Sequence, residues 1–533
     1  MNAYNKSFQN LTSNNYFWPI IIVLLAVPAF LINIDVEPLI GDEGIRGLVT
    51  LEMKLRHNLI TPTLGGEYYF NKPPLYNWIL LFFSSITGSF TDFMLRFPTV
   101  VFLALFTLSI YILASRNTSK RVAFYAAFMF LTCGRILFFD SFKGLIDMCF
   151  SWVIFLIFYA IWHYSELKQY RKMFIITYTL AAAAFLMKGI PAVAFLGISL
   201  FVYLFNEKKI RELFTYNHMI GIICFIIIIG SYYSAYYKDN PAYVSTLLER
   251  LVDESTKKST IGKGAMLSFL HLATFPFEFI YYFLPWTFLV LYLFSSQAWK
   301  SIKANRFLWY CCLIFAGNII LYWISPDTFA RYLFMFLPLV FIVLSQLYVE
   351  NASKNTTVNR IIRIFFLVLI SILLFALILP PFLKRTENAP FVVLKTIFLF
   401  SAALIVVILY LKKVSLQIEL TLVFLLITRI GFDWFVMTDR YNESPSEIRK
   451  QEISKIIEIS KGKTLHYDSQ VNIPLLLNLT RKKMELLKYD RTYIKQCYYI
   501  VSDTNALQAV DYEKLSSLHS DRNEPIYTFV KIK

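Results

Sequence analysis

Apolar runs of helical length recur along the chain from Phe17 to about residue 437, and shorter polar segments separate them. A helix crosses the hydrocarbon core of a bilayer in about 20 residues, so these runs are long enough to span a membrane. The pattern predicts a polytopic α-helical membrane protein with about thirteen transmembrane helices. They cover residues 17–34, 95–115, 121–139, 146–163, 173–187, 190–205, 218–236, 279–295, 308–324, 332–350, 364–380, 393–411 and 420–437.

The polar segments between these runs alternate in character. One set is short and basic, and it holds Arg116, Lys120, Arg121, Lys168, Arg171, Lys172, Lys208, Lys209, Arg211, Lys300, Lys303, Arg306, Lys354, Arg360, Arg363, Lys412 and Lys413. The other set includes both long loops and covers residues 35–94, 140–145, 188–189, 237–278, 325–331 and 381–392. Because Lys and Arg collect in cytoplasmic loops, the alternation predicts a cytoplasmic N-terminus and an extracytoplasmic C-terminus, in a multi-pass protein of the plasma (inner) membrane.

After the last apolar run, residues 438–533 become rich in Lys, Glu and Ser. This segment contains one stretch with helical periodicity and three short apolar stretches typical of strands, at residues 446–459, 464–467, 498–501 and 526–530. The pattern predicts a transmembrane domain over 1–437 followed by a small extracytoplasmic (periplasmic) α/β domain over 438–533. His466 and His519 in this domain are interpreted as surface residues rather than ligands.

Composition agrees with a membrane protein. The chain is 57% hydrophobic and only 16% charged, with a mean hydropathy of +0.55, whereas soluble domains carry roughly 25% charged residues. The net charge of +17 is accounted for by the basic cytoplasmic loops. It does not indicate nucleic-acid binding, because no basic stripe with interleaved aromatics lies outside the apolar runs. The six cysteines show neither a disulfide framework nor a metal-ligand spacing.

The polar segment 35–94 concentrates charges and turn-forming residues. Asp42 and Glu43 directly follow the first apolar run and lie beside glycines. Two interpretations stay open for this pair: it caps the helix expected over 43–56, or it belongs to an active site at the membrane surface. The expected helix has leucines on one side, which indicates that it lies along the bilayer surface.

Lys72 is followed by two prolines, Pro73 and Pro74. Each proline restricts the residue before it to extended geometry, so the lysine is held on a stiff segment. A fixed cation beside the membrane suits a lipid-linked phosphate, whose oxygens need charge stabilisation as a bond to them breaks. The alternative is a simple turn with a lysine that reaches toward the interface.

Further charges are expected at the same outer ends of the helices. Asp147, Lys188 and Arg331 all fall at helix ends on this side of the membrane. Charges at membrane depth are costly and usually functional, so these residues are candidates for a shared site. Arg429 and Asp433 lie one helical turn apart in the last run and are expected to pair with each other in a structural role.

The order of these residues resembles that of a known family. The matching positions are Asp42-Glu43, Glu52-Met53, Thr61-Pro62, Gly66, Tyr68-Tyr69-Phe70-Asn71-Lys72-Pro73-Pro74-Leu75, Arg96-Phe97-Pro98, Asp147, Lys188-Gly189, Pro285-Trp286, Arg331-Tyr332 and Leu337-Pro338. They are similar to the bacterial aminoarabinose-transferase family of polyprenyl-phosphate-dependent glycosyltransferases, which is related to the protein O-mannosyltransferases. The resemblance covers about residues 15–440, is most specific over 41–78, and implies the GT-C fold.

The resemblance also implies roles for residues of this chain. Enzymes of this family take a sugar from an undecaprenyl-phosphate carrier at the periplasmic face and invert the anomeric centre. Asp42 matches the catalytic aspartate, and Lys72 matches the lysine near the carrier phosphate. Tyr69 matches an aromatic residue of the same motif, and Tyr332 matches a tyrosine near the cavity. Further candidates for the carrier phosphate are Arg46 and Arg331, and other cavity candidates are Glu43, Asn71, Asp147 and Lys188.

Three positions depart from the family's motifs. The family usually has Asp-Glu-x-Arg-Tyr, whereas this chain has Ile45 at the Arg position and Arg46 at the Tyr position. On a helix, this shift turns the cation by about 100°. The residue before the motif lysine is usually Glu, whereas here it is Asn71. Because these residues lie beside the expected sugar and phosphate, the identities of donor and acceptor stay open.

These features predict an integral-membrane hexosyl- or pentosyltransferase that uses an undecaprenyl-phosphate sugar donor. The acceptor would be a lipid A-like glycolipid, as in lipopolysaccharide modification, a polysaccharide or a protein of the cell envelope. A phosphate leaving group departs as an anion, so the site must supply cations rather than a general acid. Asp42 would act as general base for a hydroxyl acceptor, or orient a phosphate acceptor. This mechanism requires no cofactor, and a divalent metal is compatible with it.

Two alternatives are kept beside this hypothesis. One is a protein O-mannosyltransferase-like enzyme, because the same aspartate and membrane scaffold would serve a protein acceptor. The other is a transporter or flippase of lipid-linked intermediates. A transporter should place its charges and broken helices near the bilayer midplane, whereas the conspicuous charges of this chain are expected at one face. The enzyme is therefore favoured.

Overall fold

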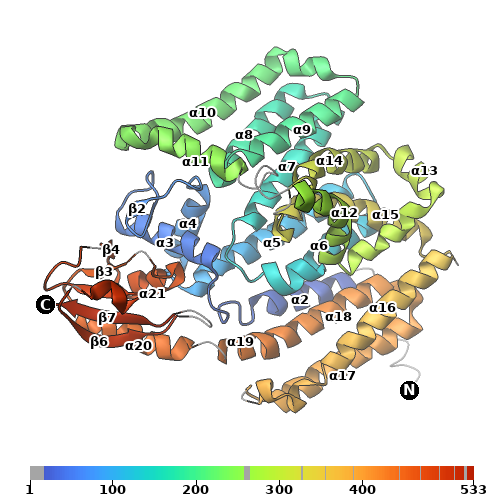
Figure 1. Cartoon of the computed structure of the whole chain (residues 1–533). Coiled ribbons are helices and arrows are strands. Elements are labelled where there is room, and N and C mark those ends of the chain that lie inside the picture. The colour runs from blue at the N-terminus through green and yellow to red at the C-terminus, as the bar shows by residue number, and fades with distance from the viewer. Residues whose placement is uncertain are drawn as a thin grey trace.

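The computed structural model describes residues 17–256, 265–325, 328–354, 356–387, 389–442, 445–468, 470–490, 492–508, 510–520 and 525–533. Most of the described chain forms a large bundle of helices. A small C-terminal domain, drawn in red, packs against one side of this bundle beside the blue elements α3, α4 and β2 (Figure 1).

The bundle contains helices of very different length and one two-stranded hairpin. Its elements are α2 (Phe17–Leu31), α3 (Gly41–Leu55), β1 (Thr63–Leu64), β2 (Glu67–Tyr68), α4 (Leu75–Thr87), α5 (Asp92–Ser115), α6 (Lys120–Thr132), η1 (Ile136–Asp140), α7 (Asp147–Glu166), α8 (Tyr170–Lys188), α9 (Pro191–Asn206), η2 (Ile210–Phe214), α10 (Tyr216–Asp239), η3 (Pro241–Tyr243), α11 (Val244–Thr256), α12 (Ala265–Tyr282), η4 (Trp286–Phe294), α13 (Ser296–Ala304), α14 (Arg306–Trp323), η5 (Ala330–Phe336), α15 (Leu337–Asn351), α16 (Thr357–Ala376), η6 (Pro380–Phe382), η7 (Lys384–Thr386), α17 (Val392–Lys412), η8 (Val414–Leu416), α18 (Gln417–Gly431), η9 (Phe432–Met437) and α19 (Thr438–Asn442).

Within the described residues, eight helical segments are long and apolar enough to cross a membrane. They are α5, α7, α10, α14, η5 with α15, α16, α17, and α18 with its continuation to Tyr441. Three shorter apolar helices, α2, α4 and α9, accompany them. The predicted class, a polytopic helical membrane protein with a small C-terminal sheet domain, is therefore confirmed, whereas the count of thirteen spans stays a prediction.

The helices divide into a buried centre and an apolar periphery. Most residues of α7, α15 and α18 are buried, whereas fewer than a quarter of those in the spans α10, α16 and α17 are. Exposed apolar side chains on the peripheral helices match a surface that faces lipid. At the centre, Arg429 and Asp433 form the predicted pair at 3.0 Å, and Arg429 also donates to the carbonyl of Ala29 on α2.

The C-terminal domain is a five-stranded sheet with helices. Its elements are α20 (Ser446–Ile459), β3 (Leu465–Tyr467), α21 (Ile473–Lys483), β4 (Lys488–Tyr489), β5 (Tyr498–Val501), η10 (Thr504–Leu507), β6 (Tyr512–Leu518) and β7 (Tyr527–Ile532). The strand order is β4-β3-β5-β7-β6, with β3 parallel to β4 and β5, and β7 antiparallel to β5 and β6. The three expected strands and the expected helix are present.

Two predictions are wrong, one for His466 in the C-terminal domain and one for the leucines of α3. His466 is not a surface residue: it is only 4% exposed, and its ring stacks on Tyr499 with the centroids 4.8 Å apart. The leucines of α3 do not face the bilayer surface either. Leu48 and Leu51 are fully buried by protein, because α3 is covered by α21 of the C-terminal domain, which the sequence pattern did not predict.

Candidate active site

Helix α3 begins the polar segment that follows α2, and its first turn carries two carboxylates. Asp42 and Glu43 lie in this turn, where acidic side chains are favoured by the helix dipole. Glu43, and not Asp42, caps the helix: its Oε2 accepts the backbone N–H of Ile40 at 2.9 Å. The capping role that the sequence left open for the pair therefore belongs to Glu43. Asp42 is left for another task.

Asp42 joins a network of charged side chains from four elements. Its Oδ2 accepts a hydrogen bond from Arg331 of η5 at 3.0 Å. The Nε of Arg331 lies 3.4 Å from Asp147 at the start of α7, and Asp147 also pairs with Lys188 at the end of α8, at 2.5 Å. Four candidates that are far apart in sequence are thus brought together.

Exposure differs sharply within this network. The Asp42 side chain is 56% exposed, whereas those of Arg331, Asp147 and Lys188 are 14%, 7% and 11% exposed. An exposed carboxylate held by a nearly buried guanidinium keeps a free side for a substrate. Removing both cations would leave the buried carboxylate of Asp147 unpaired, which is costly.

Tyr332 lies against the two cations of the network. The Nζ of Lys188 lies 4.0 Å from the centroid of the Tyr332 ring, and the guanidinium of Arg331 lies 5.4 Å from it. Phe329 covers Arg331 from another direction at 4.4 Å. Aromatic faces attract cations and keep them partly away from water. These rings therefore fix the cations without neutralising them.

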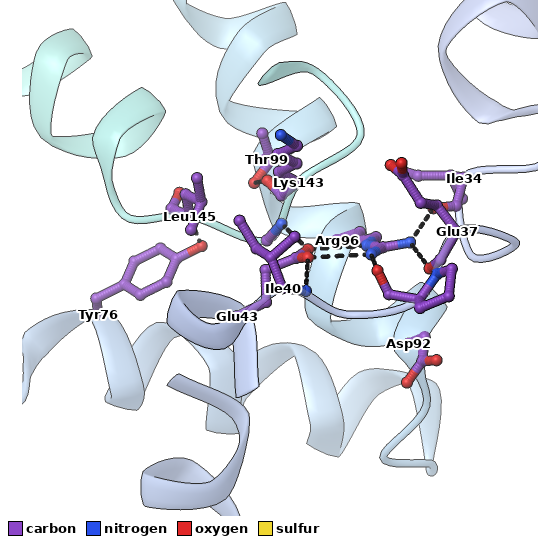
Figure 2. Close-up of polar contacts among 12 residues, drawn as sticks. Ile34, Glu37, Ile40, Glu43, Tyr76, Asp92, Arg96, Thr99, Lys143 and Leu145 are labelled. Carbon is purple, nitrogen blue, oxygen red and sulfur yellow. Dashed lines mark hydrogen bonds and ion pairs between the residues drawn. The ribbon is translucent and has the colours of Figure 1, made fainter. Parts of the chain in front are cut away.

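Glu43 lies at the centre of a separate, buried cluster, shown in Figure 2. Its two oxygens accept from Nε and Nη2 of Arg96 on α5, at 2.8 and 3.0 Å. Oε1 also accepts the backbone N–H of Gly144 at 2.6 Å. With the bond from Ile40, both oxygens are saturated, and Glu43 is only 1% exposed. Its role among the cavity candidates is thus that of a buried support rather than a group that contacts solvent.

Arg96 connects this support to the end of the preceding segment. It is fully buried and donates to the carbonyls of Ile34, Glu37 and Pro38 at 3.0, 2.7 and 3.2 Å. The Glu43–Arg96 pair therefore ties the chain before α3, α3 itself and α5 into one unit. In the sequence Arg96 is only part of a motif without a role, because Glu43 is distant in the chain and the other partners are backbone carbonyls, which have no sequence signature.

The segment 141–146 leads into Asp147 and is held at three consecutive residues. Thr99 donates to the carbonyl of Lys143 at 2.8 Å, Glu43 accepts from Gly144, and Tyr76 donates to the carbonyl of Leu145 at 3.2 Å (Figure 2). The same carboxylate that caps α3 thus also fixes the approach to α7. Asp42 and Asp147 are positioned by one buried hub.

Arg46 lies on the same face of α3 as Asp42, one turn further along. It is buried and donates through Nη2 to the hydroxyl of Tyr69, and its guanidinium lies 5.2 Å from the centre of that ring. Among the described residues, its Nη1 has no hydrogen-bond partner and the guanidinium has no ion pair. A buried cation with spare donors suits an anionic ligand.

The Lys72 motif lies between the hairpin β1–β2 and α4. Asn71 is exposed and Lys72 is half-buried, whereas Pro73 and Pro74 are buried and α4 begins directly after them at Leu75. The two prolines are therefore anchored in the protein while the side chains before them face outward. This arrangement agrees with the stiff segment expected from the sequence.

The described part of the chain offers no metal site. No group of three or more His, Cys, Asp or Glu side chains in it is placed to hold a metal ion. Among the candidate cations, Arg331 and Lys188 lie together in the charge network with Asp42 and Asp147.

Comparison with known proteins identifies the fold. Residues 71–233 match the family model of dolichyl-phosphate-mannose-protein mannosyltransferases. Over nearly the whole chain, the structure is similar to the crystal structure of ArnT from Cupriavidus metallidurans bound to undecaprenyl phosphate, with a TM-score of 0.71 and 16% identity, covering 97% of this chain and 98% of that one. The apo structure of the same protein gives a TM-score of 0.70 and 15% identity over the same shares.

No curated protein sequence matches the chain. At this low identity, the structural similarity establishes the fold, which is that of the GT-C glycosyltransferases, as the sequence resemblance implied. The family match adds sequence similarity over a part of the membrane region that contains Asn71, Lys72, Asp147 and Lys188.

Proposed function

We propose that this protein is an integral-membrane glycosyltransferase that moves a sugar from an undecaprenyl-phosphate-linked donor to an acceptor of the cell envelope, with inversion at the anomeric carbon. The observation that carries the proposal is the position of Asp42. It is the exposed carboxylate of an otherwise nearly buried charge network, in a fold shared with a protein whose structure holds undecaprenyl phosphate. Asp42 is the residue that we assign to catalysis.

The cations around Asp42 support a phosphate leaving group. When the bond between sugar and phosphate breaks, charge develops on the phosphate oxygens, and fixed cations stabilise it. Arg46 has an unsatisfied buried donor, Arg331 is held within 3.0 Å of Asp42, and Lys72 lies on its proline-anchored segment. We assign the phosphate to these three residues, with Tyr69 and Tyr332 as their aromatic supports.

Asp42 has one of two tasks, depending on the acceptor. For a hydroxyl acceptor, it takes the proton as the oxygen attacks the anomeric carbon from the face opposite the phosphate. For a phosphate acceptor, which is already nucleophilic, it orients the attacking group. In both cases Arg331 holds the carboxylate in place through its hydrogen bond at 3.0 Å.

We place the reaction at the periplasmic face of the inner membrane, with the N-terminus in the cytoplasm and the C-terminal domain outside. The support is the alternation in the sequence between short, basic loops and the set that includes both long loops. Acceptors compatible with this location are a lipid A-like glycolipid, a polysaccharide or a protein.

Protein O-mannosylation is the second candidate function. The family whose model matches residues 71–233 is described as dolichyl-phosphate-mannose-protein mannosyltransferase. A transporter of lipid-linked intermediates is disfavoured, because Asp42, Arg331, Asp147 and Lys188 gather at helix ends in one site rather than at broken helices near the midplane.

The test compares the cell envelopes of four strains: wild type, a deletion strain, and the deletion strain expressing either Asp42→Asn or Asp35→Asn. Asn removes the charge at constant volume. Asp35 is the matched control, because it is an exposed carboxylate close to Asp42 in sequence, and no contact of its side chain is recorded in the described structure. Lipid A, surface polysaccharide and glycoproteins are then analysed by mass spectrometry.

The proposal predicts that one sugar-sized mass is missing from one component in the deletion and Asp42→Asn strains and present with Asp35→Asn. A loss confined to glycoproteins would favour the second candidate. If the deletion strain accumulates a lipid-linked intermediate while Asp42→Asn behaves like the wild type, the enzyme assignment is wrong and a transporter is indicated.

A further inference from the structure

Helix α3 presents two opposite faces to its surroundings. Successive helical residues are turned by about 100°, so Asp42 and Arg46 share one face, and Gly44 and Gly47 lie on the other. The first face carries the site. The second face has no side chains at these two positions, which lets another element approach the helix backbone closely.

Helix α21 of the C-terminal domain occupies this glycine face. A methyl group on Gly44 would lie 2.9 Å from Cγ of Pro474, and one on Gly47 would lie 2.6 Å from Cδ2 of Leu477. Both distances are shorter than any normal carbon–carbon contact. Pro474 is the second residue of α21, and Leu477 lies about one turn later and is fully buried. The two helices therefore pack with no spare space between them.

Two polar contacts hold the C-terminal domain beside α3. The hydroxyl of Tyr467 on β3 donates to the carbonyl of Gly65, in the hairpin that follows α3, at 2.6 Å. Arg481 near the end of α21 pairs with Asp92 at the start of α5, also at 2.6 Å. These contacts lie on different elements of the bundle, so they define the position of α21 relative to the whole site.

We propose that α21 is a positioning element of the active site: it sets the distance of Asp42 and Arg46 from their partners by packing against the glycine face of α3. The C-terminal domain thereby acts on catalysis without touching the substrate. This inference rests on the proposed function, because it assigns the positioned residues to sugar transfer.

The geometry explains why such a contact would matter. Asp42 is held by Arg331 at 3.0 Å from one side, and the opposite face of α3 rests on α21. A methyl group on Gly44 would meet the ring and the backbone nitrogen of Pro474, and one on Gly47 would meet the buried side chains of Leu477 and of Leu95 on α5. Room for either methyl group has to come from a shift of these groups, which changes how α3 rests on its neighbours. A misplacement of about 1 Å is enough to reduce turnover by roughly a hundredfold in sites that depend on orientation.

The experiment uses the full-length protein, with lipid-linked sugars extracted from the deletion strain as donor. Gly47→Ala inserts the methyl group, and Gly41→Ala is its matched control, because it lies on the same helix with nothing within 4 Å. The double variant Gly47→Ala with Leu477→Val restores the total volume, since one carbon is added and one removed. Turnover per folded molecule is measured at saturating donor, together with amide hydrogen exchange of residues 41–55.

We expect Gly47→Ala to reduce turnover by about tenfold or more and to change the amide exchange rates of α3. The double variant with Leu477→Val should recover both turnover and exchange rates. Gly41→Ala should match the wild type. The inference is overturned if Gly47→Ala equals Gly41→Ala, or if the double variant stays as low as the single one. If the wild type itself transfers no sugar, the proposed function fails, and the exchange rates alone then decide whether α21 positions α3.

Discussion

Asp42 and Glu43 are neighbours in the chain, yet they lie in opposite environments. Glu43 is buried and saturated by Arg96 and two backbone N–H groups. Asp42 is more than half exposed, and among the described residues its side chain is held by Arg331 alone. The first arrangement gives a rigid support, and the second leaves a charged group free to meet a substrate. The two carboxylates therefore divide structure and chemistry between them.

The same contrast extends to the cations. Arg96 spends its donors on Glu43 and three backbone carbonyls, whereas the buried Nη1 of Arg46 has no partner in the described structure. Buried polar groups normally find partners, so an exception points to a ligand. The two arginines thus differ in whether their donors are satisfied, which their equal charge does not show.

The largest effect on stability is expected for Glu43→Gln. This variant keeps the shape of the side chain but leaves the buried Arg96 without its anion, which typically costs about 3–5 kcal/mol. Asp42→Asn should leave stability unchanged, because its side chain is largely exposed. Thermal unfolding of the two purified variants measures the difference. Equal unfolding temperatures would show that the two carboxylates do not divide their roles as described.

A smaller effect is expected for Arg331→Met, which acts on the site rather than on the scaffold. It releases Asp42 and removes one of the two cations beside Asp147, so we expect sugar transfer to fall by about a hundredfold, as for the loss of one preorganised donor. The fold should persist, because Asp147 keeps Lys188. The transfer rate of Arg331→Lys should lie between those of the wild type and Arg331→Met, because lysine keeps the charge but loses the forked geometry of the guanidinium. Transfer by Arg331→Met at the wild-type rate would contradict the assignment.

The smallest effect concerns His466 in the sheet of the C-terminal domain, which is not part of the charge network. Burial lowers the pKa of His466, although Asp490 at 3.7 Å opposes the shift. A lowered pKa means that the unfolded chain takes up the proton first, so stability is full above the usual histidine pKa of about 6.5 and falls as the pH drops below it. His466→Phe keeps a ring against Tyr499 and should flatten this dependence, as measured by urea unfolding between pH 7 and 5. An unchanged slope would contradict it.

Much of this architecture could be predicted from the sequence. Hydrophobic runs indicate membrane helices directly, and the alternation of loop charge placed Asp147, Lys188 and Arg331 at one side, where the structure brings them together. The stiffness of the Lys72-Pro73-Pro74 segment was predicted from the backbone restriction that proline imposes. These features depend on local sequence pattern or on a shared depth in the membrane, and both can be inferred from the sequence.

The parts that could not be predicted depend on long-range contacts. The family resemblance matches Asp42 to the catalytic aspartate, but nothing in the sequence shows that Glu43 is the buried member of the pair, because its partners Arg96 and Gly144 are distant in the chain. Helix α21 has consecutive rather than periodic apolar residues, because it is buried on several sides between its own domain and α3. From its residue type, His466 is predicted to lie at the surface. It is buried by the sheet around it, which the local sequence does not show.

The central claim is that this site binds the phosphate of a polyprenyl carrier. Native mass spectrometry of the purified protein with undecaprenyl phosphate, and with undecaprenol as control, tests it most directly. We expect the protein to bind undecaprenyl phosphate much more strongly than undecaprenol. Arg46→Met and Lys72→Met should each weaken the binding of the phosphate, whereas Asp35→Asn should not. Equal binding of undecaprenyl phosphate and undecaprenol, or wild-type binding of the phosphate by both Arg46→Met and Lys72→Met, would show that this site does not bind the carrier phosphate.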